Sequence, residues 1–232
     1  MQESLAIARG IGDKERVGAA LTLLGHVVLM QDPAAARDYY EEALALGREL
    51  GDKRRLANVL NGLAVLYQSQ GDLDRAQALY EETLAIDRER REPEGLALDL
   101  VNIATVSIQR GSVDRVPEML LEALEIADKA GFKRSVLIVL FHSIALATLL
   151  GEWERAARLY GWTEAQREQT GLHREPTDEL LLAPSLAQMQ EALGMPAFHA
   201  SEVAGRSLSY DEIMAEARKW LADRAATQSS ID

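Results

Sequence analysis

The chain has 232 residues, enough to bury the core of one large domain or two small ones without covalent cross-links. It contains no cysteine, which excludes disulfides, thiolate metal sites, iron–sulfur clusters and thiol nucleophiles. The formal net charge of −12 disfavours direct binding to nucleic acid, because short basic clusters such as Lys53 to Arg55 lie among acidic residues.

Two further features of the sequence, its composition and its longest apolar run, indicate a helical protein of the cytoplasm. Proline is rare, aromatic residues make up 5% of the chain, and few stretches alternate apolar and polar residues, so strands are disfavoured and an all-α fold is expected. The apolar run from Leu21 to Met30 is too short to cross a membrane and no basic segment precedes it. We therefore expect a cytoplasmic protein without a membrane partner.

The turns repeat with a fixed spacing. Similar six-residue segments begin at Gly71, Gly111 and Gly151, which are 40 residues apart. A second set of turns interleaves with the first at Gly12, Gly51, Glu92 and Gly131. Two turns in each period indicate two helices in each repeat. A glycine can end one helix in the left-handed conformation, and a following aspartate can cap the next.

These turns divide the chain into predicted elements. Helices are expected at about 2–9, 14–30, 34–50, 53–70, 73–91, 94–110, 114–130, 133–150 and 152–170. A half repeat over 1–12 and four helical hairpins would form a solenoid over 1–171. A helical C-terminal cap is expected over 172–226, with a loop at 171–176 and helices over 177–193, from Pro196 and from Ser209. Residues 227–232 are polar and are predicted to be a disordered tail.

The best-conforming period resembles the tetratricopeptide repeat (TPR). An apolar–small pair, a tyrosine, a turn glycine, a small residue, a second tyrosine and a closing leucine follow one another in that order: Leu63-Ala64, Tyr67, Gly71, Ala76, Tyr80 and Leu84. The other three periods match in part. The resemblance covers about 170 residues and implies an α–α superhelix whose small residues let the two helices of a hairpin approach closely.

The 40-residue period is longer than the usual 34 residues of this repeat. In this respect the chain resembles the C-terminal TPR region of bacterial STAND-class signal-transduction ATPases and transcriptional regulators of the MalT and AfsR kind. The segment from Ala156 to Gly171 and the later segment from Leu193 to Glu212 are similar to the closing part of such regulators. In that family a nucleotide-binding switch precedes the repeats, but no phosphate-binding loop motif occurs in these 232 residues.

The first nine residues match Tyr40 to Arg48, the second helix of a hairpin, without a first helix of their own. We therefore expect the chain to be a fragment of a longer protein. A half repeat would leave an apolar stripe at Leu5, Ile7 and Ala8 without a partner, and this edge is a candidate surface for homo-oligomer formation.

No catalytic or metal-binding constellation is evident. The four histidines, His26, His142, His173 and His199, are far apart in the sequence, and none has a second histidine four residues away. The serines lack the motif of a nucleophile elbow, and paired glutamates such as Glu41-Glu42 fit a solvated helix face. We expect no enzymatic activity and no cofactor.

The remaining candidate site is the concave groove that the first helices of the repeats would line. The predicted partner-binding residues are Thr22, His26, Leu29, Asn58, Asn61, Val65, Gln68, Leu98, Val101, Thr105, Ile108, Phe141, Ala145 and Thr148. They are apolar or carry amides and hydroxyls, with almost no lysine or arginine, which disfavours capture of an acidic C-terminal peptide there. Periodicity cannot separate a groove from a packed core, so both interpretations stay open.

Three functions are compatible with this sequence. The first is a non-catalytic sensor or interaction arm of a larger regulator, which binds a protein partner or an inducer. The second is a free-standing TPR adaptor for protein–protein interaction. The third is a domain that binds a sugar-like inducer on the aromatic residues Trp153, Tyr160 and Trp162, although these residues favour packing between the last repeat and the cap.

Overall fold

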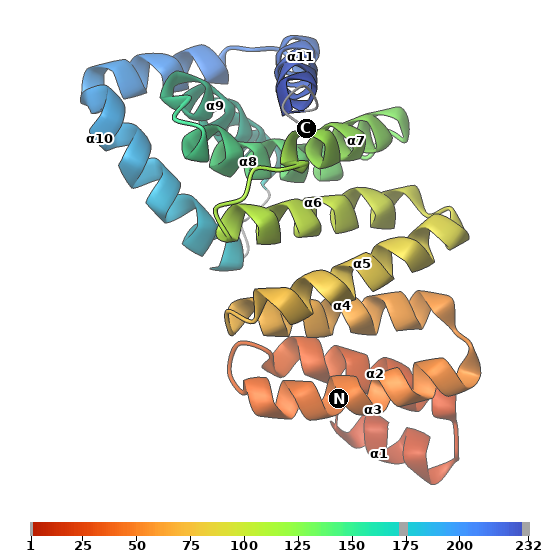
Figure 1. Ribbon diagram of the computed structural model, residues 1–232. Coiled ribbons are helices and arrows are strands. Elements are labelled where there is room, and N and C mark those ends of the chain that lie inside the picture. The colour runs from red at the N-terminus through yellow and green to blue at the C-terminus, as the bar shows by residue number, and fades with distance from the viewer. Residues whose placement is uncertain (1, 172–175, 229–232) are drawn as a thin grey trace. The chain divides into compact units, whose positions relative to one another are not determined.

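The computed structural model describes residues 2–171 and 176–228, and all regular structure in these residues is α-helical. The all-α fold class is therefore confirmed. In chain order the helices are α1 (Gln2–Gly10), α2 (Lys14–Val28), α3 (Pro33–Leu50), α4 (Lys53–Ser69), α5 (Leu73–Arg90), α6 (Pro93–Gln109), α7 (Val116–Lys129), α8 (Lys133–Leu149), α9 (Trp153–Thr170), α10 (Pro176–Arg206) and α11 (Tyr210–Gln228) (Figure 1).

The helix ends follow the turn chemistry of the sequence. Four aspartates, Asp13, Asp32, Asp52 and Asp72, stand directly before helices, and each side chain accepts a hydrogen bond from the backbone N–H three residues later. Gly51 ends α3 with φ 66°, a left-handed conformation that favours glycine. The predicted boundaries agree with these helices to within about two residues over the repeats.

The third repeat begins its second helix later than the sequence indicates. Helix α7 starts at Val116 rather than near residue 114, because Arg115 adopts a left-handed conformation (φ 58°) and Pro117 follows in the first turn.

The chain forms two compact units, residues 1–106 and 107–232, and α6 runs across the boundary. The predicted boundary between solenoid and cap, at 171/172, falls inside the second unit, and residues 172–175 and 229–232 lie outside the described part. That division stays a prediction.

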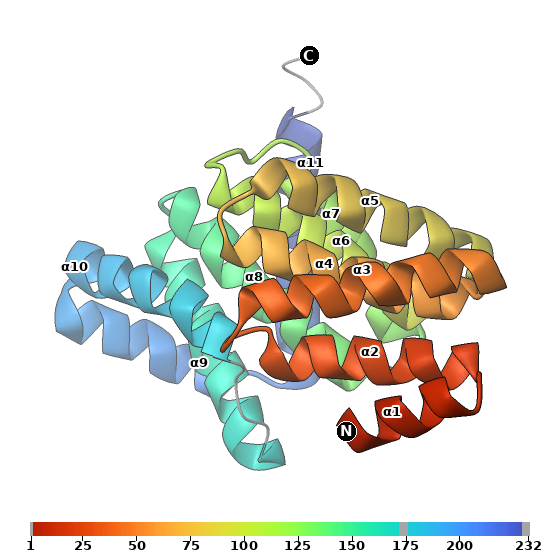
Figure 2. The same cartoon turned by 90° about the horizontal axis from the view of Figure 1, so that it is seen from below.

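The first unit is a stack of helical hairpins. Helix α2 packs against α3, α4 packs against α5, and α3 and α4 join the two hairpins (Figures 1 and 2). Tyr40 of α3 is fully buried at this joint. A Cβ atom on Gly25 of α2 or on Gly62 of α4 would lie 2.6 Å from the Tyr40 ring. The ring is therefore held between two helix backbones that approach closely only because both positions lack a side chain.

The predicted unpartnered stripe on the half repeat is wrong at two of its three residues. Leu5 and Ala8 are buried, with 6% and 3% of their surfaces exposed, because α1 packs along α2 (Figure 2). Ile7 alone is exposed, at 59%. Helix α1 thus buries most of its apolar side against the following repeat, although it is only half of a hairpin.

The second unit is built around α9. This helix packs against α8 and α10, while α11 packs against α7. Helices α9 and α10 are in close contact, since a Cβ atom on Gly205 would lie 2.0 Å from the Arg158 carbonyl oxygen. Gly194 has non-helical angles (φ 70°, ψ 154°) and divides α10 into two helical segments, as its sequence position predicts (Figure 1).

Replacing Gly62 by alanine is expected to lower the free energy of unfolding by about 1 to 3 kcal/mol, because the added methyl group collides with the enclosed Tyr40 ring. Gly10→Ala is the matched control, since a Cβ atom there has no neighbour within 4 Å. Urea unfolding followed by circular dichroism measures both variants. An unchanged midpoint for Gly62→Ala would show that the ring has room to move.

Candidate protein-binding surface

The predicted groove residues lie on the first helices of their hairpins, but they differ in accessibility. In the first unit Thr22, Leu29, Val101 and Thr105 are buried, and so is Thr148 in the second unit. The hydroxyl groups of Thr22, Thr105 and Thr148 donate 2.8 Å hydrogen bonds to carbonyl oxygens one turn earlier in their own helices. These five residues are therefore part of the packed interior and are not accessible to a partner.

The other predicted groove residues keep exposed surface. His26 and Asn58 are exposed. The half-buried residues are Asn61, Val65, Gln68 and Leu98 in the first unit and Ile108, Phe141 and Ala145 in the second. The predicted groove is therefore part core and part surface.

Two amides link neighbouring first helices in the first unit. The Asn102 amide on α6 donates a 3.1 Å hydrogen bond to the Asn61 side-chain oxygen on α4. Sequence reasoning missed Asn102, although an amide at this spacing from Asn61 was visible. The Gln68 oxygen accepts a 2.8 Å hydrogen bond from the Tyr80 hydroxyl, so Gln68 serves the hairpin itself. We define the first-helix surface as the accessible side chains Asn58, Asn61, Val65, Leu98 and Asn102.

Two buried acidic side chains lie on α6 and α5. Asp99 of α6 is 3% exposed, and one of its carboxylate oxygens has no hydrogen-bond partner among the described residues. Burial raises the pKa of Asp99 to about 8, and the nearby Asp87 carboxylate adds to the shift. Burial also raises the pKa of Asp87, although Arg90 opposes that shift through a 2.6 Å ion pair.

The sequence contained a signal for this pair. Asp99 lies 40 residues after Val59 and so occupies the same repeat position. Val59 is fully buried, so this position belongs to the core. A charge at a core position marks an unusual environment. Its neighbour Asp87 could be found only from the structure, in which the Asp87 carboxylate lies close to Gly95 of α6.

Ion pairs attach α11 to the rest of the second unit. Asp128 of α7 accepts hydrogen bonds from Tyr210 and Arg218 of α11, and the Tyr210 hydroxyl holds the pKa of Asp128 below its ordinary value. At the start of α9, burial alone would raise the pKa of Glu152, but hydrogen bonds from Arg155, Trp220 and Arg224 lower it. These contacts are structural.

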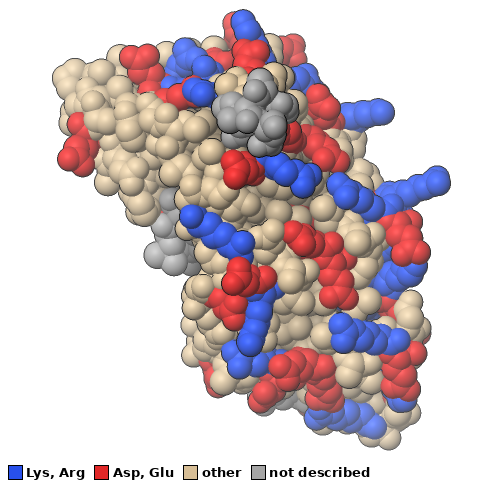
Figure 3. Space-filling view, in the orientation of Figure 1, with Lys and Arg blue, Asp and Glu red and all other residues tan. Residues whose placement is uncertain are grey.

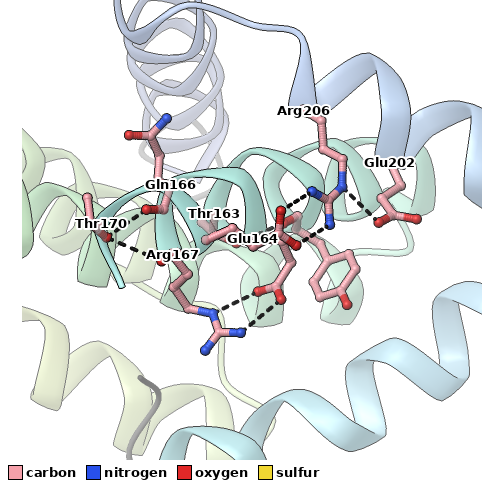
Figure 4. A network of polar contacts seen from close by, with 9 residues as sticks. Thr163, Glu164, Gln166, Arg167, Thr170, Glu202 and Arg206 are labelled. Carbon is pink, nitrogen blue, oxygen red and sulfur yellow. Dashed lines mark hydrogen bonds and ion pairs between the residues drawn. The ribbon is translucent and has the colours of Figure 1, made fainter. Parts of the chain in front are cut away.

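A second polar network joins α9 and α10. Figure 4 shows Arg206 of α10 bound to Glu202, with an Nε–Oε1 distance of 3.2 Å, and Arg167 of α9 bound to Glu164. Arg206 also bridges to Glu168 of α9 at 2.9 Å. The Arg206–Glu168 ion pair links α10 to α9, whereas the other two pairs each lie within a single helix.

Two of the three aromatic residues of the proposed sugar platform, Tyr160 and Trp162, pack against other aromatic rings. Trp162 is 2% exposed and its ring centroid lies 6.4 Å from that of Tyr210. The Tyr160 ring lies 6.1 Å from Phe198 of α10. Both contacts join α9 to the helices that follow it, so these two rings do not present a stacking face for a sugar.

The described residues contain neither a cluster of metal ligands nor a helix that could span a membrane. Within them, no group of three or more His, Asp or Glu residues could hold a metal ion. Burial lowers the pKa of His26 and that of His142, the latter to about 4, while His173 lies outside the described part. None of the helices in that part is long and apolar enough to cross a membrane.

Charged side chains are unevenly distributed over the surface. Figure 3 shows lysine, arginine and acidic side chains interspersed over much of the face in view, whereas the surface over α10 is mostly uncharged. Residues 182–205 contain only two charged residues, Glu191 and Glu202, while Met195 and Val203 are exposed at 60% and 49%.

Comparison with known proteins supports the repeat assignment. Residues 28–89, which contain α3, α4 and almost all of α5, match the tetratricopeptide repeat family. The fold is similar to that in the crystal structure of BtubC (BKLC) from P. vanneervenii, with a TM-score of 0.63, 22% sequence identity, and 99% of this chain and 88% of that chain covered. At this identity the likeness shows the fold alone. No curated protein matches the sequence.

The stability of the protein is expected to fall as the pH rises from about 4 to about 8. Asp99 has an ordinary pKa near 4 when unfolded, so the folded state binds its proton more tightly up to the folded pKa of about 8. Asp99→Asn should flatten this slope, whereas Asp114→Asn, an exposed control, should keep it. Urea midpoints at several pH values measure the effect, and parallel curves for wild type and Asp99→Asn would contradict it.

Proposed function

We propose that this chain is a non-catalytic scaffold for protein–protein interaction, which binds its partner on the first-helix surface. The match of residues 28–89 to tetratricopeptide repeats supports this role, because such repeats present extended binding surfaces. The observation that carries the proposal is the exposure of Asn58 beside the half-buried Val65 and Leu98 on consecutive first helices. The amides on this surface can form hydrogen bonds with a peptide backbone, and its apolar side chains can contact apolar side chains of the peptide.

A more specific proposal places the scaffold in a larger protein. We propose that it is the sensor arm of a bacterial STAND-class regulator in the cytoplasm, where partner or inducer binding biases a switch domain. The 40-residue period and the resemblance of the segment from Leu193 to Glu212 support this context. A phosphate-binding loop encoded upstream of Met1 in the same reading frame would support it further, and a reading frame that begins at Met1 would favour a free-standing adaptor.

Asn58→Arg is expected to weaken partner binding at least about tenfold, because a bulky cation would enter an uncharged surface. The wild-type chain captures its partner from cells of the source organism, and quantitative mass spectrometry identifies the protein. Titration of the purified partner then measures the affinity. Ala85→Arg on α5 is the matched control, since it adds the same charge to an exposed position on a second helix. Equal binding by both variants would contradict a site on the first helices.

The first repeat also has an uncovered apolar face. Val27, Leu66 and Val106 occupy the same repeat position, yet Val27 is 49% exposed while the other two are fully buried. Leu23, one turn earlier on α2, is 51% exposed. We propose that a second copy of the chain covers this face, because two such stripes related by a two-fold axis would bury each other's apolar side chains.

Sedimentation velocity tests this self-association. The wild-type protein should sediment as a dimer at rising concentration, and Val27→Asp should remain a monomer because the interface would bury an unpaired carboxylate. Ala45→Asp, at an exposed position on α3, is the control. A wild-type monomer at all concentrations would refute the proposal.

A further inference from the structure

The uncovered apolar face of α2 ends in a methionine. Leu23, Val27 and Met30 follow one another at intervals of four and three residues, and their side chains are 51%, 49% and 56% exposed. Leu29 keeps right-handed helical angles (φ −45°, ψ −47°), so the helical spacing continues to Met30. Residues at these intervals lie on one side of a helix. The Met30 thioether therefore belongs to the same apolar face as Leu23 and Val27.

The repeat does not require a methionine at this position. The spacing that relates Val27 to Leu66 also relates Met30 to Ser69 and, one period later, to Gln109. Met30, Ser69 and Gln109 are all exposed. The position carries a polar side chain in the two following repeats and an apolar thioether in the first. The methionine is thus a feature of the α2 face and not of the repeat.

The surroundings of Met30 carry no formal charge. Residues 17–31 contain no aspartate, glutamate, lysine or arginine. His26 is the one titratable side chain in this stretch, and burial lowers its pKa, so it is neutral at pH 7. The side chains of Leu23 and Val27 offer no hydrogen bond to a polar group introduced beside them. Burial of such a group on this face would therefore cost free energy.

Met30 is also accessible to an oxidant. The chain contains no cysteine, so thioethers are its only sulfur groups. Among the described methionines, Met30 and Met195 are 56% and 60% exposed, Met119 is half-buried, and Met189 and Met214 are buried. Oxidation requires contact between the oxidant and the sulfur atom, and it follows exposure. We expect Met30 and Met195 to react first.

We infer that Met30 is an oxidation site that controls self-association through the α2 face, with a peroxide as the oxidant. A lone pair of the sulfur attacks one oxygen of hydrogen peroxide, an S–O bond forms and the O–O bond breaks. The sulfur loses two electrons. The departing hydroxide takes the proton of the transferred oxygen and becomes water. The product is a sulfoxide, which is polar, and its burial against Leu23 and Val27 of a second copy disfavours the dimer.

The modification rests on the self-association proposed above, and the two proposals can be distinguished. Self-association requires that the untreated chain forms a dimer. The oxidation site requires in addition that one oxygen atom on Met30 weakens this dimer. A dimer that persists after Met30 is oxidised would contradict the oxidation site alone, whereas an untreated monomer at all concentrations would contradict both.

The test treats the full chain with hydrogen peroxide, removes the oxidant and measures sedimentation velocity. Peptide mass spectrometry should find one added oxygen on Met30 and on Met195, and little on the buried Met189 and Met214. The dissociation constant of the dimer should rise at least about tenfold. A methionine sulfoxide reductase, which restores the thioether while two thiols are oxidised to a disulfide, should restore the dimer.

Variants assign the effect to one sulfur atom. Met30→Leu keeps an apolar side chain without sulfur, so its dimer should resist peroxide. Met195→Leu is the matched control, because it removes the other highly exposed thioether and should leave the response unchanged. Met30→Gln places a polar side chain on the face and should weaken the dimer at least about tenfold without oxidant. If peroxide alters the circular dichroism spectrum, the untreated Met30→Gln and Met30→Leu proteins decide the question.

The rate of oxidation gives a second readout. Met30 should react more slowly at chain concentrations at which sedimentation shows a dimer, because the second copy covers it, while the rate at Met195 should not change. Three outcomes would overturn the inference. They are an unchanged dimer after full oxidation of Met30, an equal response of Met30→Leu and Met195→Leu to peroxide, and no protection of Met30 in the dimer.

Discussion

The close approach of neighbouring helices around a buried tyrosine is the constraint on which the first unit depends. Tyr40 occupies the space that two glycines leave open, one in its own hairpin and one in the next. One side chain therefore fixes the spacing within a hairpin and between hairpins. Its hydroxyl has no hydrogen-bond partner among the described residues, so shape rather than hydrogen bonding holds the ring. In the second unit Gly205 permits a similar approach of α10 to α9.

Tight packing also determines which side chains remain available to a partner. Threonines on the first helices bond to their own backbone and lie in the core, while Asn58 stays at the surface. The same packing buries Asp99 against Asp87, which raises the pKa of both carboxylic acids.

The repeat could be predicted from the sequence because the conformation of each turn depends on a few adjacent residues. Glycine and aspartate in the turns specify helix ends through backbone conformation and capping, which need no knowledge of distant residues. The helix boundaries of the hairpins and the kink at Gly194 followed from this chemistry. The exception is α7, where Arg115 adopts a left-handed conformation that an arginine rarely takes.

The sequence by itself determined the fold class, the period and the position of the first helices, because these depend on spacing along the chain. Only the tertiary structure decided which face of each helix is covered. It buried Thr22, Thr105 and Val101, which periodicity could not distinguish from groove residues. It also brought Asp87 of α5 near Asp99 of α6, which lie on different helices and at different repeat positions. Burial and charge proximity arise from contacts between helices far apart in the sequence, and no local pattern records them.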